Sequence, residues 1–263
     1  MGVTTRLLLL LWAGVTVSTA VDLHKRIMNG DDCGAGERLY HVKFINREGV
    51  LICGGSLINK EWILTAAHCW ETGMRAVVGV HPPQGQKPPV EITTHEIHED
   101  EDKRKHDIML LKLPQTTDIN PVELPNEADC KKHPDDEDTF QVAGHGPKDV
   151  VPGSTDIRKK ETSPTLRCAN IPFNDCFNLM EYLKNSEKER YENKKYQRLF
   201  CGETKKPKVD ISEGDSGGGV VHGGKIYGVI SFMGDRKIAY AAPAAFMNVC
   251  KYMTWIRKTA GIP

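Results

Sequence analysis

The sequence predicts a mostly β protein with a barrel-like core and a helix at its C-terminus. Many short runs rich in β-branched and aromatic residues follow one another, and glycine, asparagine or proline residues separate them. Tyr252, Trp255 and Ile256 lie at helical spacing within residues 250–259, and Gly261 follows. Many short strands combined with one terminal helix are typical of β-barrel proteins.

The expected strands fall into two groups. Those of the first half are residues 40–45, 50–52, 61–65 and 108–111. Those of the second half are residues 139–142, 165–168, 220–221, 225–232 and 238–240. Residues 130–138 are polar and charged, so we place the boundary between the two halves near residue 130. Residues 176–198 are rich in Glu, Lys, Tyr and Asn, which predicts a charged surface helix or loop.

The N-terminus has the pattern of a secretory signal peptide. Arg6 precedes an apolar run at residues 7–17, and small residues lead up to Ala20, after which we expect cleavage. The run is shorter than the roughly 20 apolar residues that span a bilayer, and no other stretch is long and apolar enough. We therefore expect residues 1–20 to be removed and the mature protein to be secreted, extracellular and not bound to a membrane. The chain has 35 Lys and Arg against 35 Asp and Glu, so its charge does not predict a nucleic-acid partner.

Export makes the eight cysteines candidates for disulfides, although about a hundred connectivities are open to them. No Cys-x-x-Cys pair occurs, so we do not expect zinc. His95, His98 and His106 lie among acidic residues, but the charges are mixed and the His-Glu-x-x-His spacing is absent. A solvated loop is predicted there instead. We expect neither a metal nor another cofactor.

The glycines of residues 214–219 clear side-chain bulk from around one hydroxyl, that of Ser216, which follows Asp215. Glycine lets a substrate approach the main chain closely and leaves backbone N–H groups free to face a developing negative charge. The stretch therefore predicts a reactive serine. An ordinary glycine-rich turn is the alternative.

A serine hydroxyl needs an adjacent base, normally a histidine that a carboxylate orients. His68 lies between a small residue and a cysteine, so it is uncrowded, although taken alone it could equally be a structural histidine. Asp107 immediately precedes the apolar run 108–111, which carries its carboxylate to the edge of a core, where it needs a partner such as a histidine. The G-x-S-x-G elbow of α/β-hydrolases needs its acid and then its histidine after the serine. Only His222 follows Ser216, before any later aspartate, which excludes the elbow.

Four segments resemble the signature segments of the trypsin/chymotrypsin family of serine endopeptidases. They are residues 27–30, 65–69, 107–110 and 214–218, in the family's order. The resemblance implies a trypsin-like serine protease domain of two antiparallel β-barrels over residues 27–263. By the resemblance, His68 is the general base, Asp107 orients it, and Ser216 attacks the peptide carbonyl. The backbone N–H groups of Gly214 and Ser216 would form the oxyanion hole.

Lys25 and Arg26 before Ile27 make a candidate processing site, with a chance basic pair in a linker as the alternative. A new α-amino group at Ile27 would be mostly charged at neutral pH, and its burial would require a carboxylate. The resemblance implies that this carboxylate is Asp215. It also implies that residues 21–26 are an activation propeptide and that the chain is a zymogen, which another trypsin-like protease activates.

The resemblance further implies a cysteine pairing and a set of partners. The implied disulfides are Cys33–Cys168, Cys53–Cys69, Cys130–Cys250 and Cys176–Cys201. The implied partners are protein or peptide substrates and protein protease inhibitors. We expect a monomer.

Substrate preference depends on Asp210, which stands where trypsins carry the aspartate that pairs with a substrate Arg or Lys. Ser231, Met233 and Ala244 are expected to line the same pocket, the last two in place of the glycines of trypsins. We expect cleavage after Arg or Lys. The alternatives are a solvated loop aspartate, a pocket that Met233 narrows toward a non-tryptic preference, and a one-residue shift that puts Gly234 at the wall.

Two further alternatives concern the whole protein. Residues 185–198 form a longer segment than the trypsin counterpart, which predicts either an exosite beside the substrate cleft or a plain charged insertion. A catalytically inactive homologue that acts as a binding protein is the other class of function. The presence of all three candidate catalytic residues favours the enzyme.

Overall fold

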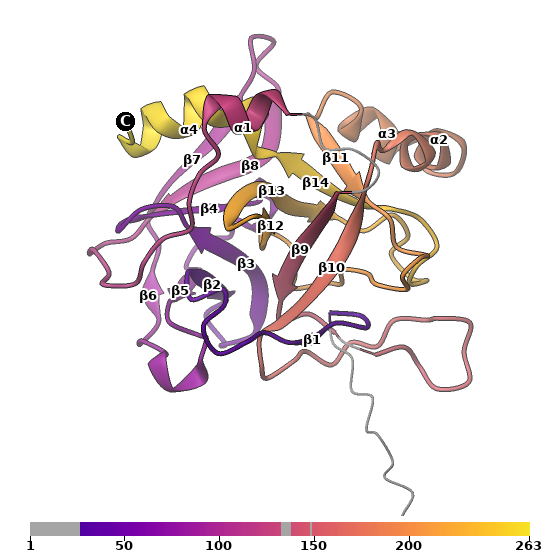
Figure 1. The fold of residues 1–263 in the computed structure, drawn as a ribbon, viewed down its shortest axis with the longest axis horizontal. Coiled ribbons are helices and arrows are strands. Elements are labelled where there is room, and N and C mark those ends of the chain that lie inside the picture. The colour runs from indigo at the N-terminus through magenta and orange to yellow at the C-terminus, as the bar shows by residue number, and fades with distance from the viewer. Residues whose placement is uncertain (1–26, 133–137, 148) are drawn as a thin grey trace, which may run out of the picture.

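The structure is a computed structural model, and it describes residues 27–132, 138–147 and 149–263. Two antiparallel β-sheets lie side by side, one from the first half of the chain and the other mostly from the second (Figure 1). The expected signal peptide at residues 1–20 and the expected propeptide at residues 21–26, with Arg26, lie outside the described residues.

The first sheet has seven strands in the order β6-β5-β2-β3-β4-β8-β7, and each strand runs antiparallel to its neighbours. Its edges, β6 and β7, are not paired with each other among the described residues, so the sheet curls without closing. The strands are β2 (His41–Ile45), β3 (Leu51–Leu57), β4 (Trp62–Thr65), β5 (Arg75–Val77), β6 (Val90–Glu91), β7 (Thr94–Glu99) and β8 (Lys105–Lys112).

The second sheet closes on itself. β9 pairs with β12 on one side and with β10 on the other, which completes a ring in the order β10-β11-β14-β13-β12-β9, and β1 adds to β10. The strands are β1 (Asp31–Asp32), β9 (Thr139–Gly144), β10 (Arg167–Asn174), β11 (Leu199–Gly202), β12 (Gly219–His222), β13 (Lys225–Phe232) and β14 (Ala244–Asn248). The predicted mostly β fold of two antiparallel barrels is confirmed, with one barrel closed and the other an open curl.

Helices lie between and after the strands. They are α1 (Glu127–Lys131), α2 (Phe177–Ser186), α3 (Lys188–Lys194) and α4 (Met253–Ala260), with the 3-10 turns η1 (Ala67–Cys69), η2 (Pro83–Gly85) and η3 (Val249–Tyr252). The predicted C-terminal helix is confirmed, but its first turn is η3. The charged segment 176–198 forms α2 and α3 at the surface (Figure 1).

Two local predictions were wrong. The solvated loop expected around His95 is strand β7, because its backbone pairs with β8 at the sheet edge and the charged side chains alternate outward. The strand expected at residues 238–240 is a turn. Tyr240 has a φ of +62° there, and only an isolated bridge joins Ile238 to Ile157.

Both ends of the described chain cross to the opposite sheet. Ile27 is fully buried among side chains of the second sheet, such as Val142 and Phe246. Ile256 of α4 is buried in the core of the first sheet, beside residues such as Leu110. The two sheets are therefore held together by segments that precede and follow them, as well as by direct contact.

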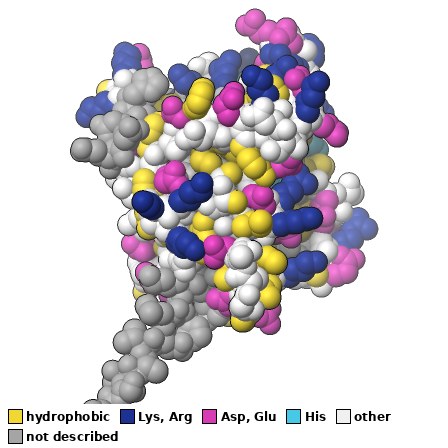
Figure 2. Space-filling view, turned by 90° about the vertical axis from the view of Figure 1, so that its right-hand side faces the viewer, with side chains coloured by type: hydrophobic (Ala, Val, Ile, Leu, Met, Phe, Trp, Pro, Cys, Tyr) yellow, Lys and Arg dark blue, Asp and Glu magenta, His cyan; other side chains and the backbone are white. Residues whose placement is uncertain are grey.

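Four disulfides reinforce this packing, and they are the same pairs that the family resemblance implies. They are Cys33–Cys168, Cys53–Cys69, Cys130–Cys250 and Cys176–Cys201. The surface carries interspersed cationic and anionic side chains on the face that Figure 2 shows. No helix within the described ranges is long and apolar enough to cross a membrane.

The fold predicts a large stability difference between two phenylalanine truncations. Phe246 is fully buried, whereas Phe177 at the start of α2 is 66% exposed. We expect Phe246→Ala to lower the free energy of unfolding by about 3–5 kcal/mol through transfer and cavity costs. The control Phe177→Ala should change it by less than about 1 kcal/mol. Urea unfolding measures both, and equal losses would contradict the described core.

Candidate active site

The loop that carries Ser216 is fixed against the first sheet. The N–H of Gly54 in β3 donates to the Ser216 carbonyl at 2.7 Å. Gly217 has a φ of +78°, and a Cβ atom there would lie 2.1 Å from Thr65 Oγ1, so only glycine fits. Gly214 likewise has a φ of +93°. These glycines let a loop of the second sheet reach the surface of the first.

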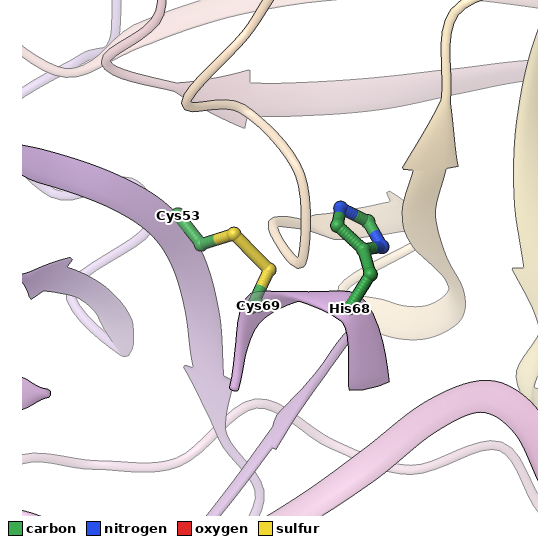
Figure 3. A group of neighbouring side chains, drawn as sticks. All are labelled: Cys53, His68 and Cys69. Carbon is green, nitrogen blue, oxygen red and sulfur yellow. A yellow bond between two sulfur atoms is a disulfide. The ribbon is translucent and has the colours of Figure 1, made fainter. Parts of the chain in front are cut away.

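His68 lies in η1, directly after β4, and its side chain is 44% exposed. The disulfide Cys53–Cys69 ties η1 to β3, and Figure 3 shows the imidazole beside that disulfide. A ring nitrogen of His68 and the two sulfur atoms lie within 4.8 Å of one another. Because the sulfurs are bonded to each other, neither is a thiolate that could bind a metal.

Asp107 lies near the start of β8 and is 6% exposed. Its carboxylate oxygens lie 2.9 and 3.0 Å from Nδ1 of His68, and Oδ1 also accepts the backbone N–H of His68 at 3.0 Å. The Ser231 hydroxyl donates to Oδ2 at 2.5 Å. A carboxylate only accepts, so Nδ1 of His68 carries the proton and Nε2 is left as the acceptor.

The surroundings of Asp107 keep it ionised. Burial opposes ionisation, but the hydrogen bond and charge of His68, the charge of Lys194 and the hydroxyl of Ser231 outweigh it, so the pKa of Asp107 lies well below its ordinary value. The Nζ atom of Lys194 lies 3.1 Å from Oδ2. Asp107 is therefore a carboxylate at neutral pH.

His68 and Ser216 line one cavity of about 530 Å³ where the two sheets meet, together with Glu213 and Gly214. Within the described part of the chain, neither Gly214 nor Ser216 donates a hydrogen bond through its backbone N–H. Free N–H donors beside a hydroxyl are what a developing oxyanion requires. The cavity can thus surround one bound carbonyl with a base, a hydroxyl and two donors.

Asp215 is fully buried next to this cavity. Its carboxylate accepts the N–H of Gly146 at 2.7 Å and that of Ser212 at 2.8 Å. Burial raises the pKa of Asp215 to about 7, although both N–H groups oppose the rise. Among the described residues, no cation forms an ion pair with it. Asp215 is therefore a buried carboxyl group that no described cation pairs with directly, although the charge of Arg158 acts on it from farther away.

Asp210 is also fully buried, so the alternative of a solvated loop aspartate does not hold. Arg158 Nη2 lies 2.5 Å from its Oδ2, and the N–H groups of Tyr240 and Ile211 donate to it at 2.9 and 2.8 Å. Burial raises the pKa of Asp210, and the charge of Arg158 opposes that rise. The carboxylate is thus already occupied by a cation of the protein itself.

The other residues that were expected to line the pocket with Asp210 each contact a different part of the protein. Ser231 is buried and bonds to Asp107, as described above, and Ala244 is fully buried in β14. Met233 is partly exposed and packs against the core of the second sheet. A Cβ atom on Gly234 would lie 2.6 Å from the Cβ of Ala242, so the chain is tightly packed there.

Sequence reasoning missed three cations of the site. Arg158 on Asp210 follows no recognisable pattern, since it comes from an irregular loop. Arg190 and Lys194 belong to the charged segment 185–198, whose unusual length was the only signal. Their contacts are described below.

A histidine held by a buried carboxylate and a serine hydroxyl on the same cavity are the parts that a serine hydrolase uses. The family model described as Trypsin matches residues 27–256. The chain therefore belongs to the trypsin family of serine proteases, which are serine endopeptidases.

Individual relatives and a solved structure agree with the family. Kallikrein-15 of Saguinus oedipus is 31% identical over 265 residues, which cover 96% of this chain and 98% of the relative. Kallikrein-8 of Rattus norvegicus is 27% identical over 264 residues, which cover 95% of this chain and 91% of the relative. The structure of neuropsin, a serine protease expressed in the limbic system of mouse brain, shares the fold with a TM-score of 0.68. It is 24% identical, and the match covers 89% of this chain and 99% of that one.

The buried ion pair of Arg158 and Asp210 should contribute to the free energy of unfolding. Arg158→Met leaves a buried carboxylate without its cation, and we expect it to lower the free energy of unfolding at pH 8 by about 3–5 kcal/mol. The double variant Arg158→Met/Asp210→Asn removes both charges and should recover most of that loss. Urea unfolding at pH 8 compares the two, and equal losses would show that the pair is not what stabilises Asp210.

Proposed function

We propose that this protein is a secreted serine endopeptidase, made as a zymogen, with His68, Asp107 and Ser216 as its catalytic residues. The observation that carries the proposal is the contact of His68 Nδ1 with both carboxylate oxygens of Asp107, with Ser216 on the same cavity. Its substrates are proteins or peptides.

In the proposed reaction, Nε2 of His68 takes the proton of the Ser216 hydroxyl as its oxygen bonds to the peptide carbonyl carbon. Negative charge then develops on the carbonyl oxygen, to which the N–H groups of Gly214 and Ser216 donate. Asp107 stabilises the imidazolium without taking its proton. His68 next protonates the leaving amine, and a water that His68 deprotonates hydrolyses the acyl-enzyme and restores Ser216.

The state of Asp215 supports activation by cleavage after Arg26. A buried carboxylate without a cation is unfavourable, and a new ammonium group at Ile27 is a cation that could pair with it. Ile27 is already buried in the core of the second sheet, and Asp215 lies in the loop between β11 and β12 of that sheet. Because Asp215 adjoins both Gly214 and Ser216, its pairing would order the donors of the oxyanion hole. A trypsin-like protease is the activating partner.

We propose a substrate preference that is not tryptic, because Arg158 occupies the carboxylate of Asp210. A substrate Arg or Lys would have to displace a guanidinium that also donates to the Ile211 carbonyl at 2.6 Å. Met233 adds bulk at the expected wall of the pocket. Cleavage after Arg or Lys is the competing proposal, and it requires Arg158 to leave Asp210.

Fluorogenic peptides ending in Arg, Lys, Phe or Ala test the activity and the preference. We expect the processed chain to cleave the Ala or Phe peptides at least about tenfold faster than the basic ones. The control Ser216→Ala should lose activity by a factor of about 10⁴ or more. Fastest cleavage after Arg or Lys would overturn only the preference. Inactivity on all four peptides would favour a non-catalytic binding protein.

Cleavage after Arg26 should also change how stability depends on pH. In the uncleaved chain the raised pKa of Asp215 favours folding below about pH 4, and this contribution is lost as pH rises through about 7. The loss amounts to up to about 4 kcal/mol. In the processed chain the ammonium of Ile27 stabilises the carboxylate, so the loss should be much smaller.

Urea unfolding between pH 4 and pH 8 measures this difference. The uncleaved form carries Arg26→Gln and Ser216→Ala, and the processed form carries Ser216→Ala to prevent self-digestion. Identical pH profiles for the two forms would rule out pairing of Ile27 with Asp215.

A further inference from the structure

A cation from the charged segment 185–198 contacts the carboxylate of Asp107, which holds His68. The Nζ atom of Lys194 lies 3.1 Å from Asp107 Oδ2, and its side chain is only 19% exposed. The same atom lies 4.8 Å from the centre of the Phe232 ring. Lys194 is the last residue of α3, so a surface insertion delivers this charge to the centre of the site.

The chain is anchored on the N-terminal side of Lys194. The guanidinium of Arg190 donates to the carbonyls of Met233 and Gly234, the latter at 3.0 Å. It also lies 4.8 Å from the centre of the Phe232 ring. Only 9% of the Arg190 side chain is exposed, so α3 is held against the end of β13.

The chain is anchored on the C-terminal side of Lys194 as well. The side-chain oxygen of Gln197 accepts the backbone N–H of Asp107 at 2.9 Å. The Tyr196 hydroxyl donates to the carbonyl of Lys105 at 3.2 Å. Because both flanks are bonded to the elements around Asp107, the ammonium of Lys194 is pre-positioned and loses less freedom than an isolated surface lysine would.

We infer that Lys194 is a positioning residue that attenuates catalysis, because its ammonium competes with the imidazolium of His68 for the carboxylate of Asp107. The inference rests on the proposed endopeptidase function. During attack by Ser216, His68 becomes positively charged, and a second cation on the same carboxylate opposes that charge. The opposition is strong because the site is partly shielded from water.

Few other charges reach Asp107. His68 faces it from η1 and Lys194 from α3, while the Ser231 hydroxyl from β13 is neutral. The phenol of Tyr252 in η3 interacts with Asp107 only at longer range and is also neutral at the relevant pH, because burial raises its pKa. Lys194 is thus the one cation besides the imidazolium that pairs with Asp107 in the described ranges.

The variant Lys194→Met removes the charge and keeps most of the length of the side chain. We expect the plateau of kcat/KM of the processed enzyme to rise about three- to tenfold. The acid limb of the pH profile should move to higher pH by about 0.5–1 unit, because a better stabilised imidazolium keeps its proton to higher pH. Lys194→Arg keeps the charge and should restore wild-type behaviour.

Two further variants control the experiment. Lys195→Met removes the same charge one residue along, where the ammonium pairs with the exposed Glu192, and it should leave the profile unchanged. Arg190→Met loosens the anchor of α3 and should shift the profile in the same direction as Lys194→Met. Both are measured on the substrate that the processed wild-type enzyme cleaves fastest.

The outcomes separate this inference from the proposed function. An inactive processed wild type would overturn the endopeptidase proposal, and the inference with it. An active wild type whose plateau and acid limb are unchanged by Lys194→Met would overturn the inference alone. A lower plateau with no shift of the limb would do the same, since it would assign Lys194 a purely structural role.

Discussion

Burial of carboxylates is the constraint on which this structure depends. Asp107, Asp210 and Asp215 are all shielded from water, and each is stabilised differently. Asp107 has an imidazole, a hydroxyl and an ammonium, and Asp210 has a guanidinium and two backbone donors. Among the described residues, Asp215 has two backbone N–H donors and the more distant charge of Arg158, but no ion pair. Because an unpaired buried charge is costly, Asp215 is the position where a new cation would change the molecule most.

The site exists because the two sheets meet closely. The first sheet supplies His68 and Asp107, and a loop of the second sheet supplies Ser216. That loop can approach the first sheet only because glycines leave no side chains at the contact. The hydrogen bond from the Gly54 N–H to the Ser216 carbonyl fixes the position of the loop relative to β3. Packing of Ile27 and Ile256, near the two ends of the described chain, on opposite sheets holds this junction together, so the geometry of the site is a property of the whole fold.

The sequence predicted those parts of the fold and site that local patterns determine. Alternating and apolar runs indicated strands such as β13, and the chemistry of a glycine-flanked serine indicated Ser216. The sequence did not predict strand β7, because there backbone pairing at the sheet edge outweighs a charged composition. It also missed Arg158 and Lys194, which meet their aspartates across 52 and 87 residues of chain. No local pattern encodes such long-range pairs, because the tertiary fold alone brings them together.

Reaction with a fluorophosphonate probe tests the central claim most directly, because only an activated serine reacts. Mass spectrometry of peptides from the processed chain should find the probe on Ser216, and His68→Ala should abolish the labelling. The uncleaved Arg26→Gln chain should react much more slowly. Absence of labelling in the folded, processed protein, or labelling that persists in His68→Ala, would contradict activation of Ser216 by His68.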